Sequence, residues 1–379
     1  MIGGSSRYFR ELLEGSNEGK SMREKSNVPL TFKCGALIII FSTFSISSQG
    51  AYTQVDPIFQ ERQILDVELT GPFFTINKER SKETKYPGGI LSYFEGEKKT
   101  SLDVKYIPRG NNRLSKDTCS YAQLWLDFKS KKVKDTLFEK QNKLKLVVQC
   151  KNNRTYEAYL IKEFQAYRIF NVLSNASFRS RLLNIRYVDT DKNTSRRHLG
   201  IIIEEKSRLA KRTGLKAAKI QKIKYQELDA QQGNLVSLFM YMIGNTDYSI
   251  ISSNEGSCCH NSKLLLDRSN SNYIPVPYDF DSSGYVNTSY ALPSDSFRIR
   301  NVRQRLYRGF CAPEEILAEN LNLFREKRKE ILAIATDQSL VPKRVAKSSS
   351  KYIEAFYKII NNPKDLQKRI IKACRGKIL

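Results

Sequence analysis

The acidic side chains that could do chemistry in this 379-residue chain lie at the ends of predicted helices and strands. Asp279 and Asp281 follow a run of strand-forming residues in "PVPYDFD", and Asp247 follows the end of an apolar helical pattern. Asn261 precedes the short strand pattern "KLLLD". Carboxylate and amide oxygens suit Mg²⁺ or Mn²⁺ bridging phosphates, and a loop after a buried helix suits a catalytic base. The alternative is a set of structural Asx turns and caps.

A lysine and a glutamate form a second candidate pair. The period-2 pattern of "NKLKLVVQC" places Lys143 and Lys145 on one face of a strand and apolar side chains on the other. Residues 155–174 predict an amphipathic helix, and Glu163 falls near its apolar face. A buried carboxylate needs a cationic partner, which Lys145 or Lys143 could supply. The alternative is an edge glutamate that faces solvent.

The patterns that must position these residues change along the chain. Residues 51–205 read as short strands and hairpins plus the one helix, as in a β-rich lobe. Residues 206–340 begin with a charged connector and then predict a mainly helical lobe. Residues 341–379 predict a basic amphipathic helix, which packs on this lobe or contacts an anionic surface. We therefore expect an α+β protein with two lobes.

The N-terminal residues 1–50 resemble a signal peptide. A basic region precedes the apolar stretch "CGALIIIFSTFSIS", and the small residues of "SQGA" follow it. Met22 offers an alternative start to Met1, because it gives a basic region of ordinary length. The pattern predicts export to the periplasm, the cell surface or the medium. An uncleaved membrane anchor is the alternative.

Six cysteines follow the signal-peptide-like residues 1–50, an even number that suits an oxidising compartment. They are Cys119, Cys150, Cys258, Cys259, Cys311 and Cys374. Because Cys258 and Cys259 are adjacent, we expect each of them to have a different partner or none.

Charge and motif content narrow the function classes. The 64 Lys and Arg residues against 39 Asp and Glu residues give a formal net charge of +25, which favours an anionic partner. With only His198 and His260, a histidine-rich metal site is excluded, and we expect His198 to face solvent. No GxSxG, GxxxxGK[ST] or GxGxxG motif is present. The leader and the lack of a recognition motif disfavour a nucleic-acid binder.

The order of these features resembles a protein-kinase-like fold and, more narrowly, the spore-coat CotH family of atypical secreted kinases. The resemblance covers roughly residues 65–312. It rests on "YIPRGNNR", "LDFKSKKVKDTLFEKQNKLKLVVQC", "YEAYLIKEFQAYRIFNVLS", "LGIIIEE", "GNTDYS" and "PVPYDFD", in that order.

The resemblance implies roles for the acidic and amide side chains. Asp247 matches the catalytic-loop aspartate that orients the accepting hydroxyl and takes its proton. Asp279 matches the aspartate that binds the metal on the nucleotide phosphates, with Asp281 as a second ligand or a support. Asn261 stands where a kinase-like loop supplies an amide to the metal.

The resemblance also implies a nucleotide site. Lys145, paired with Glu163, matches the lysine that holds the α- and β-phosphates, and Lys143 is its rival on the same face. The chain has no evident glycine-rich phosphate loop, so phosphate contacts are expected from Arg109, Arg113 or backbone amides. Glu204 and Glu205 would lie at the hinge beside the adenine.

Two function classes follow. The first is an exported kinase that transfers the γ-phosphate of ATP to a protein hydroxyl with Mg²⁺ or Mn²⁺. The second is a non-catalytic envelope or surface protein that binds an anionic partner through its basic face. The first class requires Asp247 and Asp279 to share one cleft, whereas the second does not. A degraded member that binds nucleotide without transferring phosphate is a variant of the first class.

Overall fold

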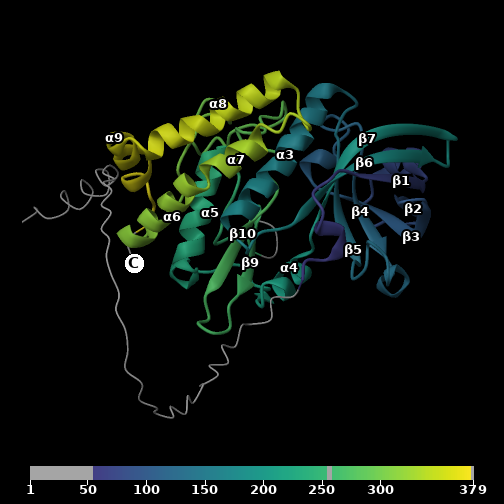
Figure 1. Ribbon diagram of the computed structural model, residues 1–379, viewed down its shortest axis with the longest axis horizontal. Helices are drawn as coiled ribbons and strands as arrows, with labels where there is room; N and C mark the ends of the chain where they lie inside the picture. Colours follow the sequence, from purple (N-terminus) through teal and green to yellow (C-terminus); the bar gives the residue numbers. More distant parts are fainter. Residues whose placement is uncertain (1–53, 254–257, 377–379) are drawn as a thin grey trace, which may run out of the picture. The chain divides into compact units, whose positions relative to one another are not determined.

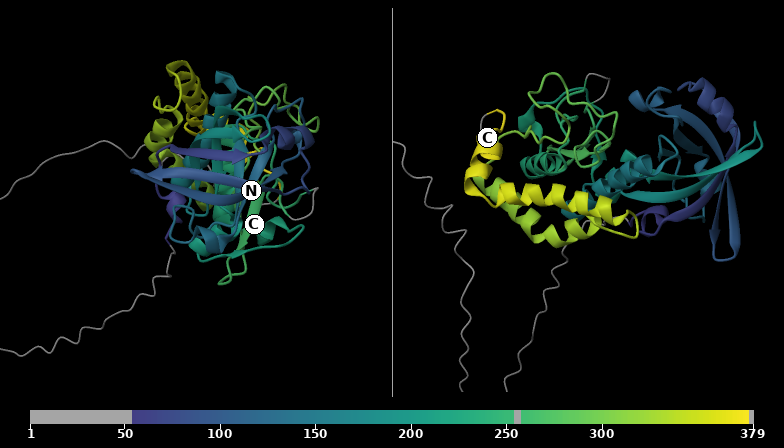
Figure 2. Two further views of the ribbon diagram at one scale, coloured as in Figure 1. Left: turned by 90° about the vertical axis from the view of Figure 1, so that its right-hand side faces the viewer. Right: turned by 90° about the horizontal axis from the view of Figure 1, so that it is seen from above.

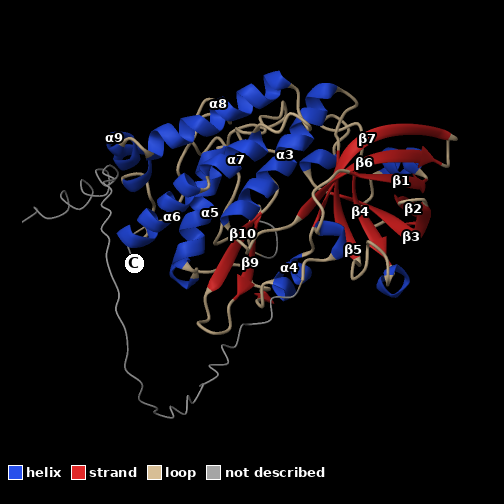
Figure 3. Ribbon diagram, viewed as in Figure 1, coloured by secondary structure: helices blue, strands red, loops and turns tan. Residues whose placement is uncertain are grey.

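The protein has an α+β structure in which a β-barrel precedes a mainly helical region (Figures 1 and 3). The computed structural model describes residues 54–253 and 258–376. The predicted leader, residues 1–50, lies outside the described residues. Among the described residues, no helix combines the length and apolar character needed to cross a lipid bilayer.

The barrel is built from the strands of the predicted β-rich lobe, in the order β1-β2-β3-β4-β5-β7-β6. Neighbouring strands are antiparallel except β1 and β6, which pair in parallel and close the barrel. Figure 2 shows the strands curving around a common centre. The strands are β1 Leu65–Gly71, β2 Tyr86–Glu95, β3 Lys98–Arg109, β4 Gln123–Phe128, β5 Lys143–Val148, β6 Ser180–Asp189 and β7 Thr194–Ile203.

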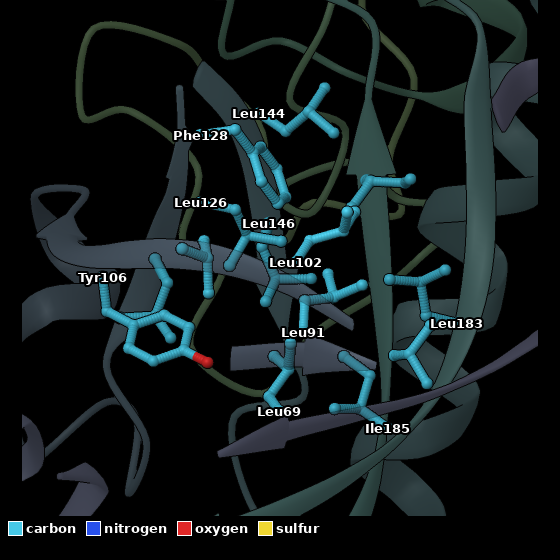
Figure 4. Packing of buried hydrophobic residues seen from close by; sticks show 14 of the residues in the cluster. Leu69, Leu91, Leu102, Tyr106, Leu126, Phe128, Leu144, Leu146, Leu183 and Ile185 are labelled. Atoms are coloured by element: carbon cyan, nitrogen blue, oxygen red, sulfur yellow. The ribbon is translucent and has the colours of Figure 1, made fainter. Parts of the chain in front are cut away.

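Alternating side chains fill the barrel interior with an apolar core (Figure 4). The labelled members of this core are Leu69, Leu91, Leu102, Tyr106, Leu126, Phe128, Leu144, Leu146, Leu183 and Ile185. The inward leucines of β5 alternate with Lys143 and Lys145, which line a cavity outside the barrel. The predicted two-faced strand is therefore confirmed.

Helix α3, Arg154–Leu173, is the helix predicted over residues 155–174. The Asn153 side chain caps it by accepting hydrogen bonds from two backbone N–H groups of its first turn. The helix contacts β6 and β7 on one side and α7, Arg328–Ala335, on another. It therefore lies between the barrel and the helical region, and both bury its side chains.

The helical region also contains a small antiparallel sheet, ordered β10-β9-β8. Helix α5, Ala230–Ile243, is buried along most of its length and ends at Gly244, whose φ of 64° is a left-handed conformation favourable to glycine. The remaining elements are α2 Phe73–Glu79, α4 Lys206–Arg212, α6 Glu314–Glu326, α8 Lys343–Ile360, α9 Pro363–Leu366, β8 Lys216–Ala217, β9 Ser262–Leu266 and β10 Tyr273–Pro277.

The basic C-terminal pattern forms α8, α9 and a short π-helical turn, Gln367–Ile371. Helix α8 buries one face, including Tyr352 and Phe356, and contacts α5 and α7. This confirms the packing expected of the C-terminal segment over its described part, residues 341–376. Contact with an anionic surface stays a prediction.

Two expectations were wrong. His198 is 4% exposed, because β7 places it beside the rings of Tyr121 and Tyr187. Burial lowers the pKa of His198 to about 4. Cys258 and Cys259 are bonded to each other rather than to different partners.

Two further disulfides, Cys119–Cys150 and Cys311–Cys374, join segments that are distant in sequence. All six cysteines among the described residues are thus paired, as is typical of proteins in an oxidising, extracytoplasmic compartment.

Candidate functional site

A cavity of about 550 Å³ lies where the barrel meets the loops of the helical region. Its lining comes from β3, β4, β5, the β7–α4 junction and the segments that flank β9 and β10. All of the predicted site residues line this cavity except Glu163. The predicted site residues in the cavity lining are Arg109, Lys143, Lys145, Glu204, Glu205, Asp247, Asn261, Asp279 and Asp281.

The β9–β10 hairpin brings Asn261 and Asp279 to the same end of the small sheet. Ser262 pairs with Pro277 in the antiparallel register, and the N–H of Tyr278 donates to the carbonyl of Asn261 at 3.1 Å. Residues just before β9 and just after β10 must therefore be neighbours. Asn261 and Asp279, which the sequence placed beside two separate strand patterns, are brought together by this register.

The backbone at Asp279 is bent sharply and held in place. Its φ is 63°, in the left-handed region, and its N–H donates to Tyr167 Oη on α3 at 2.9 Å. Phe280 is fully buried against the rings of Tyr167 and Phe239. This anchor turns the flanking carboxylates of Asp279 and Asp281 toward the cavity.

Two cations hold the Asp279 carboxylate. Arg113 Nη2 lies 2.7 Å from Oδ1, and Lys145 Nζ lies 3.4 Å from Oδ2. Burial alone would raise the pKa of Asp279, but Lys145, Arg113 and Arg109 bring it well below its usual value. Burial lowers the pKa of Lys145 to about 8, with Asp279 opposing the shift. Asp279 is therefore ionised at neutral pH.

Arg113 joins three acidic side chains. Besides Asp279, its Nη1 lies 3.2 Å from Glu163 Oε2 and its Nε lies 3.2 Å from Asp281 Oδ2. Glu163 therefore pairs with Arg113, not with the predicted Lys145 or Lys143. Burial raises the pKa of Glu163 to about 7 against the opposing effect of Arg113, and burial also raises the pKa of Asp281.

The loop that carries Arg113 is tied to the barrel. The Arg80 guanidinium donates to the carbonyls of Leu114, Cys119 and Ser120, each at 2.9 Å. The Cys119–Cys150 disulfide joins the same loop to the segment after β5. Arg113 is thus held over α3, where its charge offsets that of Glu163.

Asp247 lies across the cavity in a separate hydrogen-bonded group. Its N–H donates to Asn245 Oδ1 at 2.8 Å, and its Oδ1 lies 2.7 Å from His260 Nε2. Asn261 Nδ2 donates to the backbone carbonyl of Asp247 at 2.7 Å and to Asp247 Oδ2 at 3.0 Å. The Asp247 side chain is 48% exposed, so an incoming hydroxyl can reach it.

At the opposite end, the β7–α4 junction has the predicted hinge residues. The Glu204 carboxylate accepts two hydrogen bonds from Arg212, at 2.9 and 3.0 Å, and one from the N–H of Arg179 at 3.0 Å. Glu205 precedes the first turn of α4, and its carbonyl accepts from Leu209. The Glu204 carboxylate therefore fixes this junction.

Aromatic and cationic groups complete the cavity. Arg109 and Lys143 lie over the ring of Trp125, at 5.4 and 5.0 Å from its centroid. Arg109 Nη1 is buried without a hydrogen-bond partner among the described residues, and burial lowers the pKa of its guanidinium. Such a donor can bind an anionic oxygen at little further desolvation cost.

The oxygen donors give partial support for a metal site. In the described part of the chain, no three side chains of the His, Cys, Asp and Glu types are grouped as they would be around a metal ion. Mg²⁺ is commonly held by one or two carboxylates together with substrate phosphates, so ionised Asp279 with Asp281 or Asn261 fits a metal that arrives with a nucleotide. Binding would exchange a contact of Asp279 with Arg113 or Lys145. Metal binding stays a prediction.

Several functional contacts were not predicted from the sequence. Arg113 was expected only to contact phosphate, and His260 was not expected to contact Asp247. Tyr290 Oη, which donates to Asp281 Oδ2 at 3.1 Å, was also missed. The position of His260 directly before Asn261 was the one available signal, since a residue beside a predicted site residue shares its loop.

No protein-family model matches the chain, and no curated protein matches its sequence.

Proposed function

We propose that the protein is an exported, metal-dependent phosphotransferase with a protein-kinase-like arrangement, similar to the CotH kinases, that phosphorylates a protein hydroxyl. The observation that carries the proposal is that Asp247, Asp279 and Lys145 line one cavity. They come from three separate elements, a loop after α5, a turn after β10 and strand β5. Asx turns with purely structural roles would not need to meet there.

The nucleotide phosphates fit the cationic side of the cavity. Lys145 and Arg109 are both largely desolvated and would bind phosphate oxygens, while Lys143 is only half-buried. Phe178 and Ile203 supply apolar surface beside the β7–α4 junction, where the base would lie. A divalent ion would be held by Asp279, with Asp281 or Asn261, and would offset charge on the transferred phosphoryl group.

Asp247 would act on the acceptor. Its exposed carboxylate would orient the hydroxyl and take its proton as the bond to phosphorus forms. Asn261 and His260, which contact that carboxylate, would hold its orientation. Phosphoryl transfer needs little covalent chemistry from the protein, so positioned cations and an oriented hydroxyl account for most of the catalysis.

The test is transfer of labelled γ-phosphate from ATP, with Mg²⁺ or Mn²⁺, to the protein itself and to acidic and basic acceptor proteins. We expect Asp247→Ala and Asp279→Ala to lower the rate by about 10²-fold or more. Asp295→Ala is the matched control, because Asp295 is exposed and lies outside the cavity lining. Circular dichroism and melting temperature would establish that each variant is folded.

The outcomes separate the function classes. Transfer that Asp295→Ala retains and both site variants lose would support the proposal. ATP binding without transfer by the wild type would indicate a degraded member of the same class. If the wild type neither binds nucleotide nor transfers phosphate with either metal, the enzyme proposal is wrong. The non-catalytic binder of an anionic partner would then be preferred.

A further inference from the structure

A second cavity, of about 740 Å³, lies beside the first residues of β6, apart from the proposed nucleotide site. Its walls are the segment before β1, helix α3, the first residues of β6 and helix α7. Helices α3 and α7 are in contact here, as Figure 1 shows. Phe178 lines the first cavity, whereas Arg179 and Ser180 line this one.

Three arginines line this groove: Arg62, Arg168 and Arg179. Among the described residues, none of them forms an ion pair with an acidic side chain. Burial lowers the pKa of Arg168, and repulsion from Arg62 and Arg179 lowers it further. Attraction by Asp337 opposes these effects. The three guanidinium groups are therefore close enough to repel one another.

The acidic residues in the groove wall do not neutralise this charge. Glu61 pairs with Arg181 at 3.0 Å, and Glu330 pairs with Lys327 at 2.7 Å. The nearby Glu204 is held by two hydrogen bonds from Arg212. Each of these three carboxylates thus already has a cation, while Asp337 attracts Arg168 without forming an ion pair with it. The three arginines therefore leave an excess positive charge in a partly desolvated groove.

We propose that this groove binds a phosphoryl dianion, either inorganic phosphate or a phosphorylated side chain. Guanidinium groups present paired N–H donors that match phosphate oxygens, and three of them together suit a group with two negative charges. The groove is larger than one phosphate ion requires, so it can admit the residue that carries the group. This site is separate from the proposed nucleotide cavity and does not depend on catalysis.

The binding test uses calorimetric titration of the full chain at fixed ionic strength. The probes are inorganic phosphate, a phosphoserine peptide and the same peptide without phosphate. Arg62→Gln, Arg168→Gln and Arg179→Gln should each weaken binding of the phosphorylated probe about tenfold or more, because each removes a charged hydrogen-bond donor. Arg298→Gln is the control, because Arg298 is exposed and lies outside both cavities.

One further variant and a second readout test whether the binding is specific to the groove. Lys145→Met changes the nucleotide cavity and should leave this binding unchanged. Arg62 is exposed, so Arg62→Gln should not impair folding, and phosphate should raise the melting temperature of the wild type more than that of the arginine variants. Tighter binding of the phosphopeptide than of inorganic phosphate would identify a phosphorylated chain as the ligand, and equal affinities would identify the free ion.

Other results would overturn the proposal. Binding that Lys145→Met abolishes and the three arginine variants retain would assign the phosphate to the nucleotide cavity. If neither inorganic phosphate nor the phosphoserine peptide binds the wild type, the groove does not bind phosphoryl groups.

Discussion

Arg113 Nη1 and Glu163 Oε2 lie 3.2 Å apart in a buried ion pair between residues fifty positions apart in sequence. The same guanidinium also contacts Asp279 and Asp281, so one side chain links α3 to both carboxylates of the "DFD" turn. This linkage determines the electrostatics of the proposed site, because three carboxylates share one arginine and the neighbouring Lys145.

Replacing Arg113 should destabilise the fold strongly. In Arg113→Met the three carboxylates would lose a shared cation, and breaking such a buried pair costs about 3–5 kcal/mol. The loss should shrink at acidic pH, where the carboxylates take up protons. Urea unfolding at pH 5 and pH 7.5 would measure both effects, with Arg298→Met as an exposed control. Equal stability of Arg113→Met and wild type at pH 7.5 would contradict the role we assign to Arg113.

Glu163 should make stability depend on pH. Burial raises its pKa from 4.5 to about 7, so between these values the folded protein binds a proton that the unfolded chain has released. The free energy of unfolding should therefore fall as pH rises from about 4.5 to 7, by up to about 1.4 kcal/mol per pH unit.

Glu163→Gln tests this assignment, because the amide has nearly the same shape and does not titrate. Urea unfolding of both proteins across pH 4.5–7 should show a shallower decline for the variant. Parallel curves would mean that another group causes the dependence.

Phe280 should act as the anchor of the turn that carries Asp279 and Asp281. Phe280→Ala removes a fully buried ring from its contacts with Tyr167 and Phe239, which should cost about 3–5 kcal/mol. Phe280→Leu should cost less, because it keeps more of the buried volume. Phe94→Ala is the control, since Phe94 is 61% exposed and its loss should change stability little. Chemical denaturation would rank the three variants, and equal losses at both positions would refute the anchor role.

His260 should position Asp247 but contribute little to the stability of the fold. Its ring is 51% exposed and contacts the Asp247 carboxylate at 2.7 Å. If the kinase proposal holds, His260→Ala should lower kcat about tenfold and leave the KM for ATP and the melting temperature nearly unchanged. Steady-state kinetics would separate these quantities. A change confined to KM would place His260 in nucleotide binding instead.

The Cys311–Cys374 disulfide should contribute more stability than the adjacent pair. It closes a loop across a sequence separation of 63, for which the chain-entropy model gives about 4 kcal/mol, whereas Cys258–Cys259 closes almost none. Replacing each pair by serines and comparing urea midpoints would test this. A larger loss for the adjacent pair would show that unfolded-state entropy is not the main effect.

The sequence by itself determined most of the elements and which way their side chains face. The alternation of "NKLKLVVQC" placed Lys145 opposite the barrel core, and Gly244 marked the end of α5. The strand patterns after Asn261 and before Asp279 led us to expect that these two residues converge, and the β9–β10 register brings them together. These are local properties, because a period of two or 3.6 residues and a tight turn constrain only nearby positions.

Only the tertiary structure decided which distant side chains meet. The segment between β3 and β4 has no hydrophobic period, so its sequence did not indicate that Arg113 would reach Glu163. His198 lies in a basic stretch of sequence, yet the pairing of its strand buries its side chain beside two tyrosines. Cysteine pairing likewise depends on the approach of separate segments. Periodicity specifies the face of each element, whereas distances between elements arise from packing the whole chain.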